Sequence, residues 1–488
     1  MKPGRGWVFL LLGAGTGLLF LTTKLSWLTP VLLGVLFSQL PNTPSKGVFV
    51  RVFWFAVGFF TLHLWWLPAS LGALFGPISY LLFALMVPIL AGMWAFTAAL
   101  TRLLYGGNVL LALPFSWVVM EHLRSLGVFQ FTWGTLGYLW VGSPVAQVAD
   151  VGGVYLLSLL GMLLACFLAQ LPRISPVLFF TLPLLGAAVV AGLAPTSTPP
   201  GALKAALVQG SIPPEQKARG RQQDELSTYL SLSQGVPDDA LVVWPETASP
   251  VALDEKRKAE LLHINPRWLV GAPRWDGDRS FNSVTGLSAS GSAAYDKRIL
   301  VPFGERFPLQ DQLPEMYRWV FSSMGLPELR GVTPGTVQTP LEVGGVRYGT
   351  YICYESTFPD LTRQLVKKGA QVLVNVSNDS WFGQGLGARQ HFLMGTVRAI
   401  ETRRYLLRAG NDGITAVVGP EGETLTSLPR GVRGVLLGKY TPMDGETLYV
   451  KYGNWVVGLS WLVLLALLAH RSPWQTSPKD RLKSHPQG

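Results

Sequence analysis

Long apolar segments, separated by short polar connections, occupy most of the first 200 residues of this 488-residue chain. A helix needs about 20 consecutive apolar residues, and at least about 17, to cross the hydrocarbon core of a bilayer. Eight segments meet this requirement, at residues 7–23, 25–41, 52–71, 77–100, 108–126, 151–171, 174–194 and 454–470. The pattern therefore predicts a polytopic α-helical membrane bundle of eight transmembrane helices, seven of which precede residue 200.

A different pattern begins after a Pro/Thr-rich linker at 195–200, where short apolar runs alternate with polar stretches of helical period. This alternation is typical of an α/β domain. We expect strands at 204–209, 240–245, 268–272, 281–287, 293–297, 347–353 and 370–376, and helices at 221–234, 254–263, 358–368 and 387–409. The predicted organisation is a seven-helix transmembrane bundle at 1–200, an α/β domain at 201–450, an eighth transmembrane helix at 451–471 and a basic tail at 472–488.

The charge content supports this division of the chain. Charged residues make up 14% of the chain, whereas an ordinary soluble domain has about 25%, so a disordered protein and a simple soluble enzyme are excluded. Residues 1–200 contain two acidic and eight basic residues, which leaves 27 acidic and 32 basic residues for the rest of the chain. No dense Lys/Arg patch is interleaved with aromatic residues, so the net charge of +11 does not indicate a nucleic-acid partner.

The positions of Lys and Arg predict the orientation in the membrane, because short cytoplasmic loops are enriched in these residues. With the N terminus inside, the short outside loops contain only Lys24 and Arg124. The inside segments then contain Lys2, Arg5, Lys46, Arg51, Arg102, Arg173, Arg471, Lys479, Arg481 and Lys483. We therefore expect a multi-pass protein of the bacterial cell inner (cytoplasmic) membrane, with both termini in the cytoplasm and residues 201–450 in the periplasm.

Three predicted strands lead into residues with complementary chemistry. Glu246 follows the sequence LVVWP, Lys297 opens the sequence KRILVPFGE, and Cys353 follows a run of β-forming residues and precedes Tyr354 and Glu355. Taken singly, these residues are more simply a helix cap, a surface charge and a small buried side chain. Together they provide a base, a cation and a nucleophile.

These motifs resemble the nitrilase superfamily, whose catalytic Glu, Lys and Cys lie on a four-layer αββα sandwich, and this resemblance covers about residues 203–440. The whole chain is more similar to the membrane branch of that superfamily, the apolipoprotein N-acyltransferases, in which the domain is inserted between the seventh and eighth membrane helices. Shared segments include VQGSIP at 208–213, FNSV at 281–284 and VSNDSWFG at 376–383. At 217–219 this chain has Lys-Ala-Arg where the family usually has a tryptophan, so a substrate contact by that tryptophan is not carried over.

The resemblance implies an N-acyltransferase with a Glu246, Lys297, Cys353 triad that acts in ping-pong order. Glu246 would deprotonate Cys353, which would attack the acyl ester of a membrane phospholipid and form a thioester. Lys297 and the backbone N–H of Tyr354 would stabilise the oxyanion. The acyl acceptor would be the N-terminal amine of the diacylglyceryl-cysteine of a diacylated lipoprotein, so the activity would complete lipoprotein maturation.

Further residues are expected to support the triad or to cover it. The resemblance implies that Glu305 orients Lys297 or Glu246, that Glu355 holds the nucleophile turn, and that Asn282 of the FNSV segment is a supporting residue. Residues 306–335 are interpreted as a mobile arm facing lipid, although an ordinary amphipathic surface helix explains them nearly as well. The side chains proposed to contact substrate or close the site are Trp319, Phe321 and Met324 of this arm, together with Trp381 and Phe382, for which core packing is the alternative.

No metal and no cofactor are expected. The two Cys residues, Cys166 and Cys353, are expected to be free thiols. No pair among the six His and two Cys residues has the spacing of metal ligands. The sequence has no phosphate-binding loop or dinucleotide fingerprint. His391, which follows the SNDSWFG segment, is interpreted as a hydrogen-bonded structural histidine.

Two other functions stay open at this point. One is a membrane-anchored amidase or other hydrolase of the nitrilase type, and the other is a non-catalytic lipid-binding or transport scaffold. The complete Glu, Lys and Cys set argues against the scaffold, and the nearly uncharged bundle argues against a transport pathway. The apolar arm and the membrane base argue against a small soluble substrate.

Overall fold

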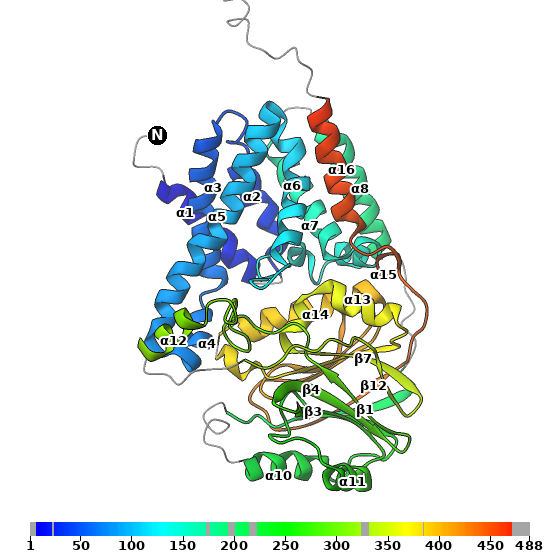
Figure 1. Cartoon of the computed structure of the whole chain (residues 1–488). Coiled ribbons are helices and arrows are strands. Elements are labelled where there is room, and N and C mark those ends of the chain that lie inside the picture. Colours follow the sequence, from blue (N-terminus) through cyan, green and yellow to red (C-terminus); the bar gives the residue numbers. More distant parts are fainter. Residues whose placement is uncertain are drawn as a thin grey trace, which may run out of the picture.

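The computed structural model describes residues 6–21, 24–171, 176–193, 201–213, 222–323, 331–383 and 385–470. A helical region formed by the N-terminal part of the chain and one C-terminal helix lies on one side of a two-sheet domain (Figure 1). Several predicted features lie outside the described residues, namely the linker at 195–200, the Lys-Ala-Arg sequence at 217–219, Met324 and the tail at 472–488.

Each predicted apolar segment contains a helix. The helices are α1 (Gly6–Leu21), α2 (Thr29–Phe37), α3 (Ser45–His63), α4 (Leu67–Phe75), α5 (Ser79–Tyr105), α6 (Val109–Arg124), α7 (Ala149–Leu168), α8 (Pro176–Leu193) and α16 (Trp455–Ala469). Among the described residues, three helical stretches are long and apolar enough to cross a membrane, Ser45–His63, Gly76–Arg124 and Pro144–Leu168. The N-terminal region is therefore a helical region with membrane-spanning character, and the count of eight spans stays a prediction.

The third segment differs from its predicted bounds of 52–71. Helix α3 begins seven residues earlier, directly after Pro44, whose extended conformation stops the preceding turn. It ends at His63, and α4 then begins with a proline in its first turn. Proline is favoured at the start of a helix because its missing N–H would have no partner there, so Pro68 separates two helices that hydropathy alone joins.

The two-sheet domain contains two six-stranded sheets, ordered β12-β1-β2-β3-β4-β5 and β11-β10-β9-β8-β7-β6. In the first sheet the strands are β1 (Leu203–Gln209), β2 (Ala240–Val243), β3 (Arg267–Asp276), β4 (Arg279–Ser288), β5 (Gly291–Asp296) and β12 (Gly434–Tyr440). In the second they are β6 (Leu341–Val343), β7 (Val346–Ile352), β8 (Val372–Ser377), β9 (Leu406–Gly410), β10 (Thr415–Val418) and β11 (Thr424–Leu428). Buried side chains from both sheets, such as Leu207, Leu269 and Val374, form the core between them.

Helices cover both outer faces and complete four layers. Helices α10 (Gln222–Ser233) and α11 (Glu255–Ile264) lie on the side away from the membrane helices, while α13 (Pro359–Lys367) and α14 (Gly387–Thr402) lie between the second sheet and the membrane helices (Figure 1). This arrangement is the nitrilase-like domain that the strand-end motifs predict. The parallel pairs β1–β2, β2–β3, β7–β8 and β8–β9 place the ends of β2 and β7, which lead to Glu246 and Cys353, inside the sandwich and not at its edges.

The predicted helix at 387–409 is wrong in its last part. Helix α14 ends at Thr402, Arg403 adopts a left-handed conformation with φ of +48°, and Leu406–Gly410 forms the central strand β9. All five residues of β9 are buried, and a continuous apolar run cannot be assigned to a strand or a helix by its period. Strands β6, β9, β10, β11 and β12 were not predicted from the sequence.

The two regions share one packed interface. Buried residues of α13 and α14, including Leu365 and Val397, belong to the same hydrophobic core as those of the membrane helices. Polar contacts cross the interface as well, since Glu401 accepts a hydrogen bond from the backbone N–H of Val154 (2.9 Å) and Arg403 pairs with Asp150 (2.8 Å). The domain is therefore docked on the helical region with its α13 and α14 layer facing the bundle.

Candidate active site

Glu246 follows β2 after Trp244 and Pro245 and is 6% exposed. Its Oε1 atom accepts hydrogen bonds from Asn282 Nδ2 (2.7 Å) and Lys297 Nζ (3.1 Å), and its Oε2 atom accepts one from the backbone N–H of Asn378 (2.9 Å). The neighbouring Thr247 has a positive φ of +50°, a conformation that costs a non-glycine residue free energy. The carboxylate is therefore held from three directions.

Lys297 follows β5 and is 1% exposed. Its ammonium group donates to Glu246 and also to Glu305 Oε1 (2.7 Å), whose other oxygen accepts from the N–H of Val301. Burial by itself would lower the pKa of Lys297, but Glu246, Glu305 and Cys353 together hold that pKa well above its usual value. The structure thus keeps a full positive charge on Lys297 in a site that excludes most water.

Cys353 directly follows β7 and begins the short helix η6 (Cys353–Thr357) with a positive φ of +49°. Burial raises the pKa of the Cys353 thiol, Glu246 raises it further, and Lys297 acts in the opposite direction. The charges of Glu246 and Lys297 therefore both act on the sulfur, in opposite directions. The resting sulfur is therefore a thiol, and a thiolate forms only when a base takes its proton.

The residues after Cys353 fix this turn in the domain. Glu355 is fully buried and accepts hydrogen bonds from the hydroxyl of Tyr295 (2.9 Å) and from the backbone N–H groups of Arg298 (2.7 Å), Ile299 (3.1 Å) and Ile352 (2.7 Å). The turn is thus tied to the segment that carries Lys297. The hydroxyl of Tyr354 donates to the backbone oxygen of Gln130 in the helical region (2.7 Å), so the turn is also attached to the membrane side.

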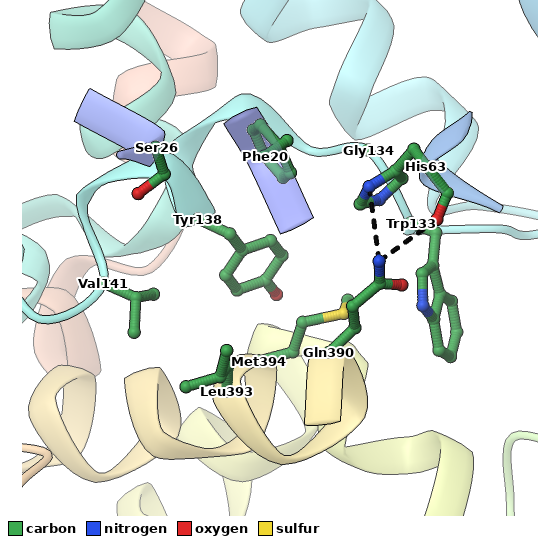
Figure 2. A pocket seen from close by; sticks show the side chains of 10 residues that line it. All are labelled: Phe20, Ser26, His63, Trp133, Gly134, Tyr138, Val141, Gln390, Leu393 and Met394. Atoms are coloured by element: carbon green, nitrogen blue, oxygen red, sulfur yellow. Dashed lines mark hydrogen bonds between the residues drawn. The ribbon is translucent and has the colours of Figure 1, made fainter. Parts of the chain in front are cut away.

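A pocket lies between the helical region and α14 (Figure 2). Gln390, Leu393 and Met394 project into it from α14, and the opposite wall comes from the helical region, with Gln390 Nε2 donating to the backbone oxygen of His63 (3.1 Å). The other lining residues are Phe20, Ser26, Trp133, Gly134, Tyr138 and Val141. Its cavity of about 40 Å³ is much smaller than the roughly 300 Å³ or more of a small-molecule site, so no substrate is assigned to it.

Trp133 connects this pocket to the turn Cys353–Thr357. Its ring stacks on Tyr354 (5.8 Å between centroids) and lies 6.2 Å from the ring of His391. Phe382, in the short helix η7 (Asp379–Phe382), packs edge-on against Trp66 (5.1 Å), and its neighbour Trp381 is 41% exposed. Aromatic side chains from both regions therefore lie together beside Cys353.

The predicted arm residues lie apart from this cluster. Helix α12 (Pro314–Ser323) buries Phe321, which packs on Phe307 (5.0 Å), and exposes Trp319 (71%). The two side chains thus face opposite ways, and Phe321 belongs to the small core of the arm.

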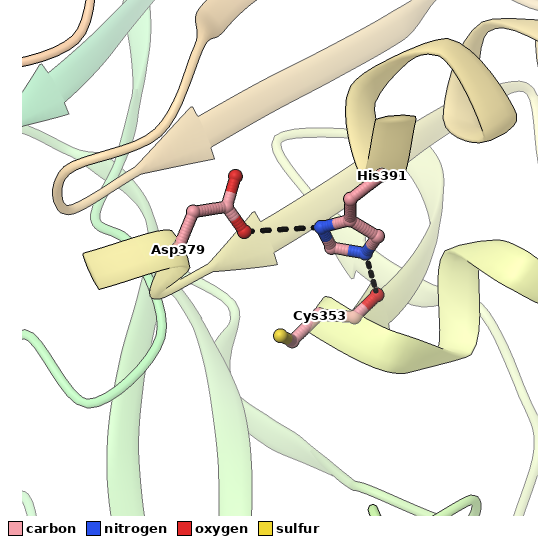
Figure 3. Close-up of side chains that lie close together, drawn as sticks. All are labelled: Cys353, Asp379 and His391. Atoms are coloured by element: carbon pink, nitrogen blue, oxygen red, sulfur yellow. Dashed lines mark hydrogen bonds and ion pairs between the residues drawn. The ribbon is translucent and has the colours of Figure 1, made fainter. Parts of the chain in front are cut away.

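Three residues near Cys353 were not assigned to the site from the sequence. His391 Nδ1 lies 3.0 Å from Asp379 Oδ1, and His391 Nε2 lies 2.9 Å from the backbone oxygen of Cys353 (Figure 3). Arg408 Nη2 donates to Asp379 Oδ2 (2.6 Å). The hydrogen-bonded structural histidine expected at position 391 agrees with these contacts. The SNDSWFG segment is the one local signal in the sequence for this cluster, because Asp379, His391 and Arg408 are far apart along the chain.

The cluster also has the composition of a metal site. Ligand atoms of Cys353, Asp379 and His391 lie within 4.8 Å of one another. However, the guanidinium of Arg408 contacts both Asp379 and His391 Nδ1 (3.1 Å), so a cation already balances the carboxylate. Arg408 and His391 hold the pKa of Asp379 well below its usual value even though burial opposes this. The charge of this cluster is therefore balanced by Arg408 without a metal ion.

Comparison with known proteins gives a consistent result over both regions. The family model "Apolipoprotein N-acyltransferase N-terminal domain" matches residues 12–167, and the model "Carbon-nitrogen hydrolase" matches residues 204–445. An apolipoprotein N-acyltransferase of Pseudomonas aeruginosa is 34% identical over 483 residues, covering 92% of this chain and 92% of that protein. The chain belongs to the apolipoprotein N-acyltransferase family.

Other members of the family align over similar lengths. The Azotobacter vinelandii protein is 34% identical, with 91% of each chain covered, and the Chromobacterium violaceum protein is 32% identical, covering 94% of this chain and 92% of its own. Among solved structures, Saccharomyces cerevisiae Nit3 of the nitrilase superfamily covers 52% of this chain and 94% of its own at 18% identity, with a TM-score of 0.37. The family assignment rests on the full-length relatives.

Proposed function

We propose that this protein is an apolipoprotein N-acyltransferase that moves an acyl chain from a membrane phospholipid, through a thioester on Cys353, to the N-terminal amine of a diacylated lipoprotein. The observation that carries the proposal is the buried contact of Glu246 with Lys297 (3.1 Å) beside a strained cysteine, in a domain docked on apolar helices. Membership of the family and the names of its members support the acyl transfer and the lipoprotein acceptor.

In the first half-reaction Glu246 takes the proton of Cys353, and the thiolate attacks the ester carbonyl. The carbon–oxygen bond then breaks, and the proton on Glu246 passes to the departing alkoxide, which leaves as a lysophospholipid. Lys297 and the backbone N–H of Tyr354 stabilise the oxyanion. A preorganised donor of this kind contributes about 3 kcal/mol to the transition state.

In the second half-reaction the neutral N-terminal amine attacks the thioester carbonyl. Glu246 accepts a proton from the nitrogen as the new amide forms, and the carbon–sulfur bond breaks. The proton on Glu246 then returns to the sulfur, which restores the thiol. One carboxylate serves both half-reactions because Glu246 takes up a proton and gives it back in each of them.

The proposal includes the cellular location of the protein. Both substrates are lipids, and the apolar helices support a protein of the bacterial inner membrane. The distribution of Lys and Arg supports a periplasmic catalytic domain with both termini in the cytoplasm. A tag at the C terminus that is modified by a membrane-impermeant reagent from outside the cell would contradict this orientation.

Intact-mass measurement tests the mechanism. The purified protein is incubated with a phospholipid of defined acyl chains, and we expect a mass increase of one acyl group on Cys353. Cys353→Ala should abolish the adduct. Cys166→Ala is the matched control, because Cys166 is buried in α7 away from the site and its loss should leave the adduct unchanged.

Addition of a diacylated lipopeptide should then remove the acyl group and give a triacylated product. If folded wild-type protein forms no adduct, the thioester mechanism is wrong. If only water discharges the adduct, the protein is a nitrilase-type hydrolase held at the membrane.

A further inference from the structure

A continuous chain of buried side chains leads from Arg408 to the backbone of the nucleophile. Arg408 in β9 donates to Asp379 after β8, Asp379 contacts His391 in α14, and His391 reaches the carbonyl oxygen of Cys353 (2.9 Å). Arg408, Asp379 and His391 are all 0% exposed. The chain is anchored further, since Ser377 Oγ donates to Asp379 Oδ1 (2.6 Å) and Arg408 Nη1 donates to Asn375 Oδ1.

The hydrogen on His391 can be assigned from its partners. A carbonyl oxygen only accepts hydrogen bonds, so Nε2 must carry the hydrogen that is shared with the oxygen of Cys353. On the other side, Nδ1 either donates to Asp379 or accepts from Arg408. When Nδ1 accepts from Arg408, the neutral ring carries its one hydrogen on Nε2; when Nδ1 donates to Asp379, the ring carries a hydrogen on both nitrogens.

His391 is therefore not free to act as the base for the sulfur. Its Nε2 atom is occupied by the carbonyl oxygen of Cys353 and by Ser356 Oγ (2.8 Å). The sulfur lies on the other side of Cys353 from the oxygen that His391 holds (Figure 3). The direct role available to His391 concerns the backbone of this turn.

Holding that oxygen has a consequence for Tyr354. The carbonyl of Cys353 and the N–H of Tyr354 belong to one planar peptide group, and in a trans peptide they point in opposite directions. Cys353 has a φ of +49°, which non-glycine residues rarely adopt. Without His391, the oxygen keeps only the i→i+3 backbone partner that the 3-10 helix η6 gives it. The peptide group is then freer to rotate towards a more common conformation, and the N–H of Tyr354 turns with it.

We propose that His391, supported by Asp379 and Arg408, is a positioning residue that fixes the Cys353–Tyr354 peptide plane and so aims the N–H of Tyr354 at the oxyanion. This inference rests on the proposed acyl transfer, and it assigns the SNDS part of the SNDSWFG segment a second task. Asn378 holds Glu246 through its backbone N–H, while the adjacent Asp379 holds His391. One short segment thus positions both the base and the nucleophile turn.

The test compares two reactions of the same sulfur. Acylation by a phospholipid develops an oxyanion, whereas alkylation by iodoacetamide is a displacement at carbon that needs no oxyanion donor. In His391→Phe, which keeps an aromatic ring beside Trp133 and Phe382, the rate of acyl-adduct formation should fall about a hundredfold. The loss should appear in kcat and not in KM. Alkylation of Cys353, followed by mass spectrometry of its peptide, should change by less than about twofold, as for a residue without contact to the sulfur.

Conservative and distant variants complete the test. His391→Gln keeps an N–H donor of similar reach and should recover at least half of the lost activity on a logarithmic scale. His263→Phe, at an exposed position of α11, should behave as the wild type in both reactions. Melting temperatures show whether each variant is folded. If His391→Phe does not fold, His391→Gln and Asp379→Asn are measured in its place. In both we expect a slower acylation with unchanged alkylation, and a smaller loss than the one expected for His391→Phe.

The outcomes separate this inference from the proposed function. Wild-type protein that forms no adduct disproves the acyl transfer itself. Wild-type protein that forms the adduct, with folded His391→Phe equally fast, disproves only the role of His391. A parallel loss of acylation and alkylation would also overturn it, because His391 would then act on the sulfur and not on the oxyanion donor.

Discussion

The turn that carries Cys353 and the arm that carries α12 belong to the same domain but differ in the contacts that hold them in place. Four hydrogen-bond donors converge on Glu355 in the turn, and His391 holds the carbonyl of Cys353. The arm is fastened by backbone hydrogen bonds at its base, such as that from Thr333 N–H to Ser280 (2.7 Å), and by a small aromatic core.

The two segments also differ in how far their side chains are exposed. Residues around Cys353 are buried, whereas the arm exposes apolar side chains, namely Leu309, Leu313, Met316 and Trp319. Electrostatic stabilisation of a transition state requires groups that are already in place, while a lipid substrate requires an entrance with an apolar surface. In the proposed reaction the buried turn meets the first requirement, and the exposed apolar face of the arm meets the second.

The largest expected effect concerns the rigid site. Glu246→Gln should lower the rate of acyl-adduct formation by about 10²- to 10⁴-fold, the usual contribution of a general base. The same change removes a negative charge that raises the pKa of Cys353 and leaves Lys297 in place. The pKa of the thiol should therefore fall, and the pH profile of its alkylation by iodoacetamide should shift to lower pH.

Rates of both reactions on the same preparation provide the measurement. Glu260→Gln, an exposed carboxylate in α11, is the control for loss of one negative charge. An alkylation profile that does not shift in Glu246→Gln would mean that the charge of Glu246 does not act on the sulfur.

The next largest effect is expected where Glu355 anchors the turn Cys353–Thr357. Glu355→Gln removes the charge that its four donors share, and hydrogen bonds to a charged group contribute about 1.5–3 kcal/mol. We expect a lower melting temperature and a slower acylation by about tenfold to a hundredfold, because the turn loosens. Glu342→Gln, exposed on β6, should change neither quantity. An unchanged acylation rate in folded Glu355→Gln would show that the turn needs no such anchor.

A smaller effect is expected in the aromatic core of the arm. Phe321→Ala removes a buried ring that packs on Phe307 and Tyr317. The arm should be cut faster by limited proteolysis, while alkylation of Cys353 should be unchanged, because the core of the arm lies apart from the sulfur. Protection equal to that of the wild type would show that the arm is as firmly held as the turn.

The smallest effect is expected on the outer face of the arm. Trp319→Ala removes an exposed ring of a type that prefers the membrane interface, and we expect a few-fold higher KM for phospholipid in vesicles with kcat unchanged. Ser322→Ala on the same helix is the matched control. A change in kcat without a change in KM would place Trp319 in the chemistry and would weaken the separation of the two segments.

Much of the architecture could be predicted from local patterns. Apolar segments of sufficient length indicated the helices of the N-terminal region, and short apolar runs indicated β1, β2, β3, β4, β5, β7 and β8. Strand β9 was mistaken for the end of a helix because both faces of a central strand are buried, so its sequence lacks the alternation of a half-exposed strand. The helix break at Pro68 was missed because hydropathy does not register where backbone hydrogen bonds end.

The candidate site was predictable to a similar degree. Glu246, Lys297 and Cys353 could be selected because each follows a strand and has distinctive neighbours in the sequence. The contacts of Glu305 with Lys297 and of Asn282 with Glu246 are present in the structure, and they followed only from the family resemblance. Asp379 and Arg408 were not selected at all, since a lone buried charge has no local signal.

The sequence by itself determined that this chain has an apolar helical region and an α/β domain, and it placed a carboxylate, an amine and a thiol after strands of that domain. These properties depend on local periodicity and on neighbouring residues. Only the tertiary structure decided that His391, 38 residues beyond Cys353 and separated from it by α13 and β8, holds the carbonyl of that cysteine. The physical reason is that such a contact depends on how α14 packs over the second sheet, and that packing is a property of many distant side chains together.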